Sequence, residues 1–275
     1  MFETVLVPLS LKESAAAVER MVAALDALGA RTVVLLHVHS GPRPGRRERE
    51  LQSRAAVLRE AGYNCRAVVH SGSVAITAVR TANEEECDLI AYPWRRKSWI
   101  QRSLVGSVTK DVVRLANIPV FVYKSKRTPP AGEVLSIMYA TDFQDTDRAV
   151  IPYLKSRRPA GGELMLFHAG ERAPDPWAES RRLALVEADL QRLAEECRES
   201  GRTVRTLTVV GRPRTAVVRQ AHRSQVDVLV IGKADNERAL STMLGSTAEA
   251  VAYNARCSVL IFARSSLKEY TRDAG

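Results

Sequence analysis

Two segments near the C-terminus have the residue types and the spacing of a phosphate-binding loop. Residues 232–235, Gly-Lys-Ala-Asp, follow an apolar run, and nine residues separate Asp235 from the pair Gly245-Ser246. A glycine allows the backbone to approach a ligand closely, and the first N–H groups of a helix, with a hydroxyl beside them, bind phosphate. The same glycines also suit plain turns at a strand end and a helix start, so the segments alone leave both interpretations open.

The chain repeats itself, and the repeat places these segments in a fold. Residues 88–91, Asp-Leu-Ile-Ala, correspond to residues 227–230, Asp-Val-Leu-Val, and the Gly-Ser pair at 106–107 corresponds to that at 245–246, each 139 residues later. In both copies short apolar runs alternate with amphipathic stretches, as in βαβ units with helices on both faces of a parallel sheet. The sequence predicts an α/β protein of two tandem, doubly wound domains, each with a five-stranded parallel sheet flanked by helices.

The expected strands are short apolar runs bounded by polar residues and turn signals. In the first copy they cover residues 3–9, 31–38, 64–70, 87–93 and 118–123, and in the second copy residues 134–140, 162–168, 203–210, 226–231 and 257–263. Residues 124–132 contain two prolines and no apolar period, which is typical of a linker. We expect domains over residues 1–127 and 133–265, with the last helix of each beginning near its Gly-Ser pair.

Composition and charge limit the function classes. The 275 residues include 41 basic and 31 acidic side chains and are 45% apolar, which are globular proportions with a formal charge of +10. The first 139 residues contain 20 of the basic and 13 of the acidic side chains, so most of the excess lies in the first copy. No apolar run reaches the roughly 18 residues of a membrane span, and the first residues enter a strand rather than a signal peptide. We expect a cytoplasmic protein without a membrane span.

Residue types that commonly perform catalysis are not arranged for it. The four cysteines lie far apart without a C-x-x-C pair, so we expect buried thiols rather than a zinc or redox site. His37 and His39 alternate at a strand end, and His168 matches His37, but no acidic or cysteine partner stands at ligand spacing. The sequence lacks a nucleophile elbow, paired catalytic carboxylates and a G-x-x-x-x-G-K-[ST] loop. It gives no positive sign of an enzyme, and slow nucleotide hydrolysis is the one turnover left open.

Together these features resemble the universal stress proteins in their tandem form, over nearly the full length of both copies. The nucleotide-binding members carry G-x-x-G, nine residues and then G-[ST]. The second copy has Gly232, then Asp235 in place of the second glycine, and then the Gly-Ser pair at 245–246. Residues 140–143, Ala-Thr-Asp-Phe, match the family's motif after the first strand, where an aspartate meets the adenosine part of the nucleotide.

The resemblance implies that an adenine nucleotide, ATP, ADP or AMP, with or without magnesium, binds in the second domain. The residues that it would place at the ligand are Ala140, Thr141, Asp142, Ala169, Ile231, Gly232, Lys233, Asp235, Gly245, Ser246 and Thr247. Adenine and ribose would lie near Asp142, and the phosphates near the Gly-Ser pair. The resemblance also implies an adenine nucleotide alpha hydrolase-like fold, and a pseudo-dimer within the chain whose final strands meet around a pseudo-twofold axis.

Three charged residues of this implied site have competing interpretations. Asp142 either contacts the ligand or simply caps the next helix, and one carboxylate can do both. Lys233 either reaches a phosphate or is a solvated loop residue. Asp235, which replaces a family glycine, is expected to repel phosphate charge unless Lys233 or a magnesium ion offsets it.

The first copy departs further from the family pattern. Pro93 and Arg96 replace both early glycines and Ser10 replaces the aspartate, although the Gly-Ser pair is kept. Residues 92–102 form instead a basic loop with interleaved aromatic residues, which suits single-stranded nucleic acid or another anion, or else a solvated loop whose tryptophans cover an interface. We therefore expect any nucleotide to occupy the second copy alone.

The leading hypothesis is a stress-response regulatory protein that binds an adenine nucleotide in its C-terminal domain and signals to an unknown protein partner. The first alternative is a tandem scaffold for protein interaction that binds no nucleotide. The second alternative is a polyanion binder that holds nucleic acid or an acidic surface through the loop 92–102. Nucleotide that co-purifies with the protein would favour the leading hypothesis, and salt-dependent retention on polyanions would favour the second alternative.

Overall fold

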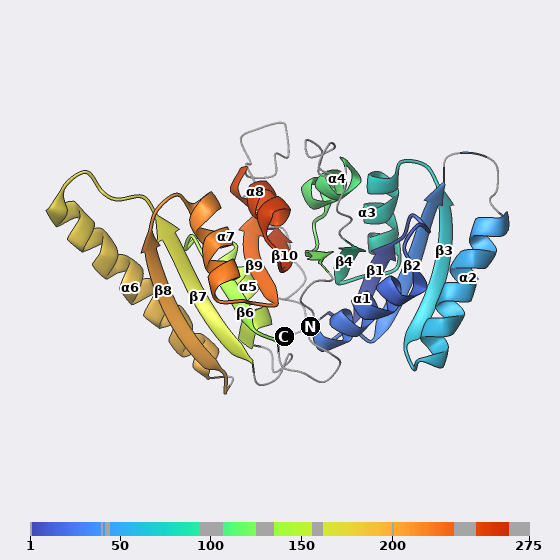
Figure 1. Cartoon of the computed structure of the whole chain (residues 1–275), viewed down its shortest axis with the longest axis horizontal. Helices are drawn as coiled ribbons and strands as arrows, with labels where there is room; N and C mark the ends of the chain where they lie inside the picture. Colours follow the sequence, from blue (N-terminus) through green and yellow to red (C-terminus); the bar gives the residue numbers. More distant parts are fainter. Residues whose placement is uncertain are drawn as a thin grey trace. The chain divides into compact units, whose positions relative to one another are not determined.

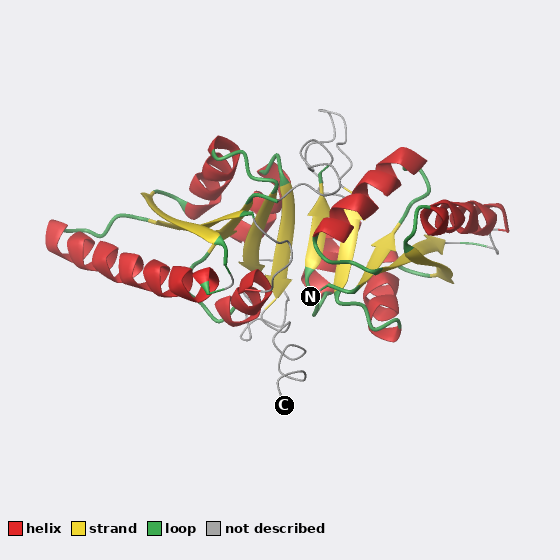
Figure 2. Ribbon diagram, turned by 90° about the horizontal axis from the view of Figure 1, so that it is seen from below, coloured by secondary structure: helices red, strands yellow, loops and turns green. Residues whose placement is uncertain are grey.

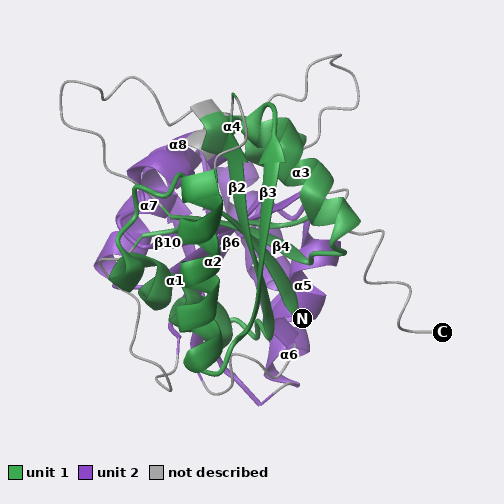
Figure 3. Ribbon diagram, turned by 90° about the vertical axis from the view of Figure 1, so that its right-hand side faces the viewer, with its two compact units in different colours: residues 1–133 green, residues 134–275 purple. Residues whose placement is uncertain are grey.

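The computed structural model describes residues 2–39, 41, 45–93, 107–124, 135–155, 162–199, 201–233 and 246–263. The chain divides into two compact units, residues 1–133 and 134–275, which are coloured separately in Figure 3. Most of the basic aromatic loop 92–102 lies outside the described residues, so its predicted role stays a sequence-based prediction.

Unit 1 contains a parallel sheet whose strands alternate with helices along the chain. Its elements are β1 (Thr4–Pro8), α1 (Ala15–Ala27), β2 (Thr32–His39), α2 (Gly45–Glu60), β3 (Asn64–Ser71), α3 (Val74–Glu84), β4 (Leu89–Pro93), α4 (Ser107–Leu115) and β5 (Val120–Tyr123) (Figure 1). The strand order is β3-β2-β1-β4-β5, and the neighbouring strands pair in parallel. The order reverses between β1 and β4, as it does in doubly wound sheets.

Unit 2 repeats this arrangement. Its elements are β6 (Ile137–Ala140), α5 (Asp147–Lys155), β7 (Glu163–Gly170), α6 (Pro176–Arg198), β8 (Thr203–Val210), α7 (Pro213–Arg223), β9 (Val228–Lys233), α8 (Ser246–Asn254) and β10 (Ser258–Ala263). The strand order β10-β9-β6-β7-β8 is again parallel throughout. The predicted fold class, two doubly wound α/β domains with five-stranded parallel sheets, is confirmed.

Helices cover both faces of each sheet (Figure 2). In unit 2, α5 packs against α6 and α7 packs against α8. The chain moves outward from β6 to β8 and then returns past β6 to β9 and β10. Right-handed crossovers therefore place the first pair of helices on one face of the sheet and the second pair on the other. The strands are accordingly buried on both faces: consecutive residues such as Leu35 and Leu36 of β2 are both fully buried. This double coverage explains the continuous apolar runs in the sequence.

The duplication is visible in backbone geometry as well as in sequence. Leu11 in unit 1 and Phe143 in unit 2 both have a positive φ, 63° and 59°, directly after the first strand of their units. In unit 1, Asp88 accepts a hydrogen bond from the N–H of Thr4 (2.9 Å). Asp227 accepts the matching bond from Ser136 (2.9 Å). A carboxylate before the fourth strand therefore fixes the start of the first strand in both units.

The four cysteines are free thiols and all are buried, as predicted. Burial raises the pKa of Cys65 and Cys197 to about 11 and that of Cys87 to about 12, so these thiols stay protonated and unreactive at neutral pH. No helix of the described residues is long and apolar enough to cross a bilayer.

Candidate functional site

The carboxyl ends of three neighbouring strands meet at one edge of the sheet of unit 2. Ala140, the last residue of β6, pairs in register with Phe167 of β7 on one side and with Ile231 of β9 on the other. The chain runs from β6 to β7, but it reaches β9 only after β8, so the strand order reverses between β6 and β9. Doubly wound proteins bind ligands in the crevice at such a reversal.

Most of the predicted site residues lie at this edge. They are Ala140, Thr141 and Asp142 at the end of β6, Ala169 near the end of β7, Ile231, Gly232 and Lys233 at the end of β9, and Ser246 and Thr247 at the start of α8. Asp235 and Gly245 lie outside the described residues. The last helix of each unit begins at the serine of its Gly-Ser pair, as predicted.

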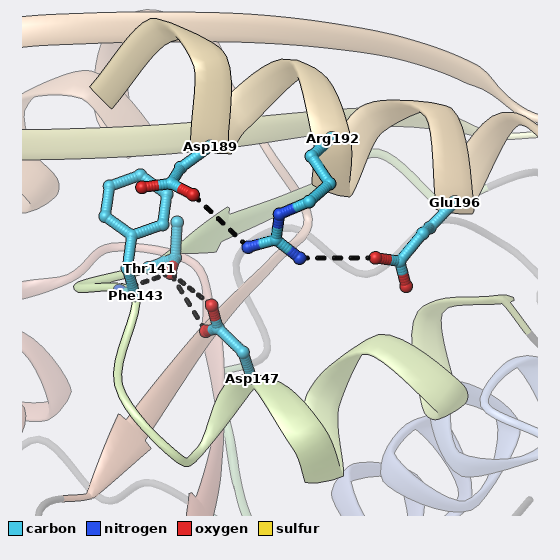
Figure 4. A network of polar contacts seen from close by, with 6 residues as sticks. All are labelled: Thr141, Phe143, Asp147, Asp189, Arg192 and Glu196. Atoms are coloured by element: carbon cyan, nitrogen blue, oxygen red, sulfur yellow. Dashed lines mark hydrogen bonds and ion pairs between the residues drawn. The ribbon is translucent and has the colours of Figure 1, made fainter. Parts of the chain in front are cut away.

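A buried hydrogen-bond network holds the loop that follows β6 (Figure 4). The hydroxyls of Tyr139 and Thr141 both donate to the carboxylate of Asp147 in the first turn of α5, Thr141 at 2.9 Å. The Thr141 Oγ1 in turn accepts the N–H of Phe143 (2.9 Å). Burial raises the pKa of Asp147, and the bonds from the two hydroxyls oppose that rise. Asp147 is partly buried, and leaving a buried polar group unpaired costs about 1 to 3 kcal/mol, so the network fixes the loop 141–147.

The fixed loop leaves Asp142 on the surface. Its side chain is exposed, and its Oδ1 accepts the N–H of Gln144 (3.2 Å), an Asx turn. The interpretation of Asp142 as a helix cap is wrong, because α5 begins only at Asp147. In unit 1 the spacing of Ser10 and Glu13 predicts a capping box at the start of the first helix. This prediction is also wrong, since Ser14 caps α1 and accepts from the N–H of Ala17. Both helices begin later than predicted because a left-handed residue turns the chain first.

A histidine from β7 contacts the loop 141–147. His168 Nδ1 lies 3.0 Å from the carbonyl oxygen of Thr141, and its ring stacks on Phe143 with the ring centroids 4.8 Å apart. Because a carbonyl only accepts, Nδ1 carries the proton. His37 makes the same contact with Leu9 in unit 1, also at 3.0 Å. The histidines thus have hydrogen-bonding roles, and among the described residues no group of three metal-ligating side chains is found.

Gly232, at the end of β9, is required for packing against the same loop. A Cβ at this position would lie 2.8 Å from the Cβ of Thr146, which is 6% exposed and directly precedes α5. Carbon atoms do not approach this closely, so any larger residue would displace Thr146 and with it the loop that presents Asp142. The glycine predicted to let a ligand approach the backbone therefore has a structural role toward Thr146.

Lys233 is not the exposed loop lysine that the sequence predicted. It is the last residue of β9, pairs in register with Ala263, and is 5% exposed. The strand extends two residues beyond the expected end at residue 231 because β10 supplies backbone partners as far as Ala263. The alternative of a solvated loop lysine is therefore wrong, and a contact between Lys233 and phosphate stays a prediction.

Arg182 is a cation at the site that sequence reasoning missed. Two of its nitrogens bond the carboxylate of Glu179, both at 2.9 Å. Arg182 and the N–H of Ala173 hold the pKa of Glu179 down at about 2. The remaining Nη1 lies 3.0 Å from the point where a Cβ on Gly170 would stand, at the end of β7. The only sequence signal was the three-residue spacing of Glu179 and Arg182, which is common on any helix surface.

Unit 1 has the same backbone at this edge without the polar groups. Val7, Leu9 and Ala15 stand at the positions that correspond to Tyr139, Thr141 and Asp147, so no hydroxyl–carboxylate network can form there. Pro93 stands at the position of Gly232 and ends β4.

The fold defines a class: tandem α/β proteins whose two parallel sheets each contain a strand-order reversal. The chain belongs to the universal stress protein family, whose family model matches residues 1–124 and 134–263. The resemblance to tandem members of this family is thus confirmed.

Solved structures share the fold over the whole chain. A universal stress protein from Archaeoglobus fulgidus is 21% identical, with a TM-score of 0.74, over 95% of this chain and 96% of its own. A putative universal stress protein from Pseudomonas aeruginosa is 19% identical, with a TM-score of 0.67, over 99% and 97% of the two chains. Among curated protein sequences no significant match was found.

Replacing Gly232 by alanine tests its packing role. Because the new Cβ would overlap Thr146, we expect Gly232→Ala to lower the free energy of unfolding by about 1 to 3 kcal/mol in urea titrations. Gly45→Ala is the matched control, since a Cβ there meets nothing within 4 Å and the change should stay within about 0.5 kcal/mol. Equal effects of the two substitutions on the free energy of unfolding would show that Thr146 can move aside without cost.

Protonation of His168 is expected to weaken the fold in mild acid. Burial lowers the pKa of His168 below its ordinary value of 6.5, so the stability that it contributes is present above pH 6.5 and is lost as the pH falls through the folded-state pKa. NMR titration of the histidine rings should give a midpoint below 6.5 for His168. The loss of unfolding free energy between pH 7 and pH 5 should be smaller in His168→Gln. A midpoint at or above 6.5 would contradict this interpretation.

Proposed function

We propose that the crevice of unit 2 binds an adenine nucleotide and that the protein is a nucleotide-dependent regulator in the stress response. The observation that carries the proposal is the loop 141–147, which a buried network fixes while it presents the exposed carboxylate of Asp142 at the strand-order reversal. Doubly wound proteins commonly use a carboxylate at this edge to bind ribose hydroxyls. The loop needs no reorganisation before it binds, which lowers the entropic cost of binding.

The remaining ligand contacts follow from the elements around Asp142. Ala140, Ala169 and Ile231 would bound the adenine and ribose, because they lie at the carboxyl ends of adjacent strands. The start of α8, with Ser246 and Thr247 after Gly245, would receive the phosphates through its unpaired N–H groups. A magnesium ion would reach the protein through the phosphates.

Arg182 extends the proposed site beyond the residues that the family motifs indicate. Its side chain is 24% exposed, and Glu179 holds the guanidinium in place through two hydrogen bonds. The nitrogen that remains, Nη1, stands beside Gly170 at the end of β7. An anionic or carbonyl group of the ligand would find a positioned donor there.

Calorimetric titration with ATP, ADP and AMP tests the proposal. We expect one site per chain, since unit 1 lacks the polar network and has Pro93 in place of Gly232. Asp142→Ala should weaken binding by about tenfold or more, as expected for loss of a charge-assisted hydrogen bond. Ser10→Ala, the equivalent change in unit 1, should leave the affinity unchanged. Two equivalent sites, or equal effects of the two substitutions, would refute the assignment to unit 2.

Asp235 is expected to set the nucleotide preference. A carboxylate about 6 Å from a phosphate charge, at an effective dielectric of 20 to 40, opposes binding by roughly 1.4 to 2.8 kcal/mol per charge. Without magnesium, AMP or ADP should therefore bind at least as tightly as ATP, and Asp235→Gly should improve ATP more than AMP. An unchanged ratio of ATP to AMP affinity would make Asp235 a spectator residue.

The alternative is a scaffold that binds no nucleotide, and one observation favours it. Thr146 fills the space beside Gly232 that the glycine would otherwise leave for a ligand. Absence of binding of all three nucleotides by a folded protein would select this alternative.

A further inference from the structure

Helix α7 and the turn before β10 carry exposed basic residues that have no acidic partner among the described residues. They are Arg212, Arg214, Arg219, Arg223 and Arg256. Residues 212–226 contain no aspartate or glutamate. None of these arginines takes part in the ion pairs formed among the described residues. The result is a concentrated basic surface whose arginines form no ion pair with the residues that the structure describes.

Three of the arginines line up along α7. Arg212, Arg219 and Arg223 are seven and four residues apart, which brings them within about 40° of one another around the helix axis. Along the helix axis the rise is about 10 Å from Arg212 to Arg219 and about 6 Å from Arg219 to Arg223. The row therefore spans about 17 Å. That length corresponds to about five phosphate steps of one strand of a duplex, at roughly 3.4 Å per step.

Arg256 is held at the end of the same helix. Its Nη1 lies 3.0 Å from Nε2 of His222, which is exposed on the last turn of α7. A guanidinium only donates hydrogen bonds, so the imidazole accepts this bond through Nε2. The contact orients Arg256 beside His222, at the end of α7, without neutralising its charge.

The corresponding helix of unit 1 shows that the fold does not require these charges. In α3 the positions of Arg212, Arg219 and Arg223 are occupied by Ser73, Arg80 and Glu84. Arg80 lies 3.5 Å from Glu84, and Glu85 and Glu86 follow directly, so this copy is compensated. Repulsion among the arginines of α7 therefore opposes folding without a structural benefit, unless a partner uses them.

We propose that the row Arg212, Arg219, Arg223 and Arg256, here called the α7 arginine row, is a docking surface for the phosphate backbone of a nucleic acid. Guanidinium groups bind phosphate through paired N–H bonds. The proposal concerns the outer face of α7 and does not depend on nucleotide binding in the crevice. Because the arginines would contact phosphates rather than base edges, binding should be independent of sequence.

The chemistry of the surface favours nucleic acid over two other partners. The residues of α7 exposed beside the row are Arg214, Thr215 and His222, and no large apolar side chain is exposed on this helix. A protein interface requires a buried apolar or aromatic centre, and a membrane-surface helix requires an exposed apolar face. A polar, strongly basic surface is the usual composition of a nucleic-acid interface.

The test measures binding of the full chain to a labelled 20-base-pair DNA duplex of arbitrary sequence at several NaCl concentrations. For Arg212→Gln/Arg219→Gln/Arg223→Gln, we expect at least tenfold weaker binding at 100 mM NaCl. The slope of log K against log salt should become shallower by about 2 to 3. The control Arg46→Gln/Arg47→Gln/Arg49→Gln removes the same charge from exposed positions of α2 and should alter the slope by less than 1. Thermal melting verifies that both variants are folded.

A gain-of-charge variant tests the geometry independently of any loss of folding. Ser73→Arg/Glu84→Arg copies the row onto α3 and should strengthen duplex binding and steepen its salt dependence. The proposal is overturned if the α7 variant binds the duplex like the unchanged protein, or if the α2 control is weakened equally. Tighter binding of the unchanged protein to polyglutamate or to anionic lipid vesicles than to the duplex would overturn it in favour of an acidic protein or a membrane.

Discussion

The carboxylate of Asp147 is the group on which the candidate site depends. It receives two hydroxyls from the end of β6, and one of them also accepts the backbone N–H of Phe143. These bonds fix the turn that presents Asp142 and place Thr146 against Gly232 at the end of β9. The carboxylate is partly buried, which raises its pKa, and the fold tolerates it because both hydroxyls donate to it directly.

The two units show which parts of the fold are structural and which are specialised. Both use a histidine of the second strand to hold the carbonyl after the first strand, and both use an aspartate before the fourth strand to fix the start of the first. These bonds satisfy backbone groups that any such sheet must pair. The network around Asp147 and the arginines at positions 212 and 223 occur in unit 2 alone, so a doubly wound sheet does not require them.

The sequence was sufficient to predict the fold because the repeat and the alternation of apolar runs with amphipathic stretches specify parallel βαβ units. It predicted where the last helices begin, because the Gly-Ser pairs mark those starts in both copies. The predicted start of α5 and the predicted end of β9 were wrong. Helix α5 begins at Asp147 because the left-handed Phe143 turns the chain first, and β9 includes Lys233 because β10 pairs with it.

The parts of the site that could not be predicted depend on contacts between distant elements. Asp147 has the sequence appearance of a surface residue at a helix start, and only the positions of Tyr139 and Thr141 show that it is buried in a network. The partner of Gly232 is 86 residues earlier in the chain, and spacing alone does not reveal a contact of this kind. The position of Arg182 beside Gly170 depends on the direction in which α6 leaves the end of β7.

The central claim is that the fixed loop of unit 2, and not its counterpart in unit 1, receives the nucleotide. Mapping backbone amide shifts by NMR while AMP is added tests this claim most directly, because both loops are observed in one sample. We expect saturable shifts at Thr141, Phe143 and Gly232, with Leu9 and Leu11 unchanged. Shifts at Leu9 and Leu11 of the same size, or none in either loop at millimolar AMP, would contradict the claim.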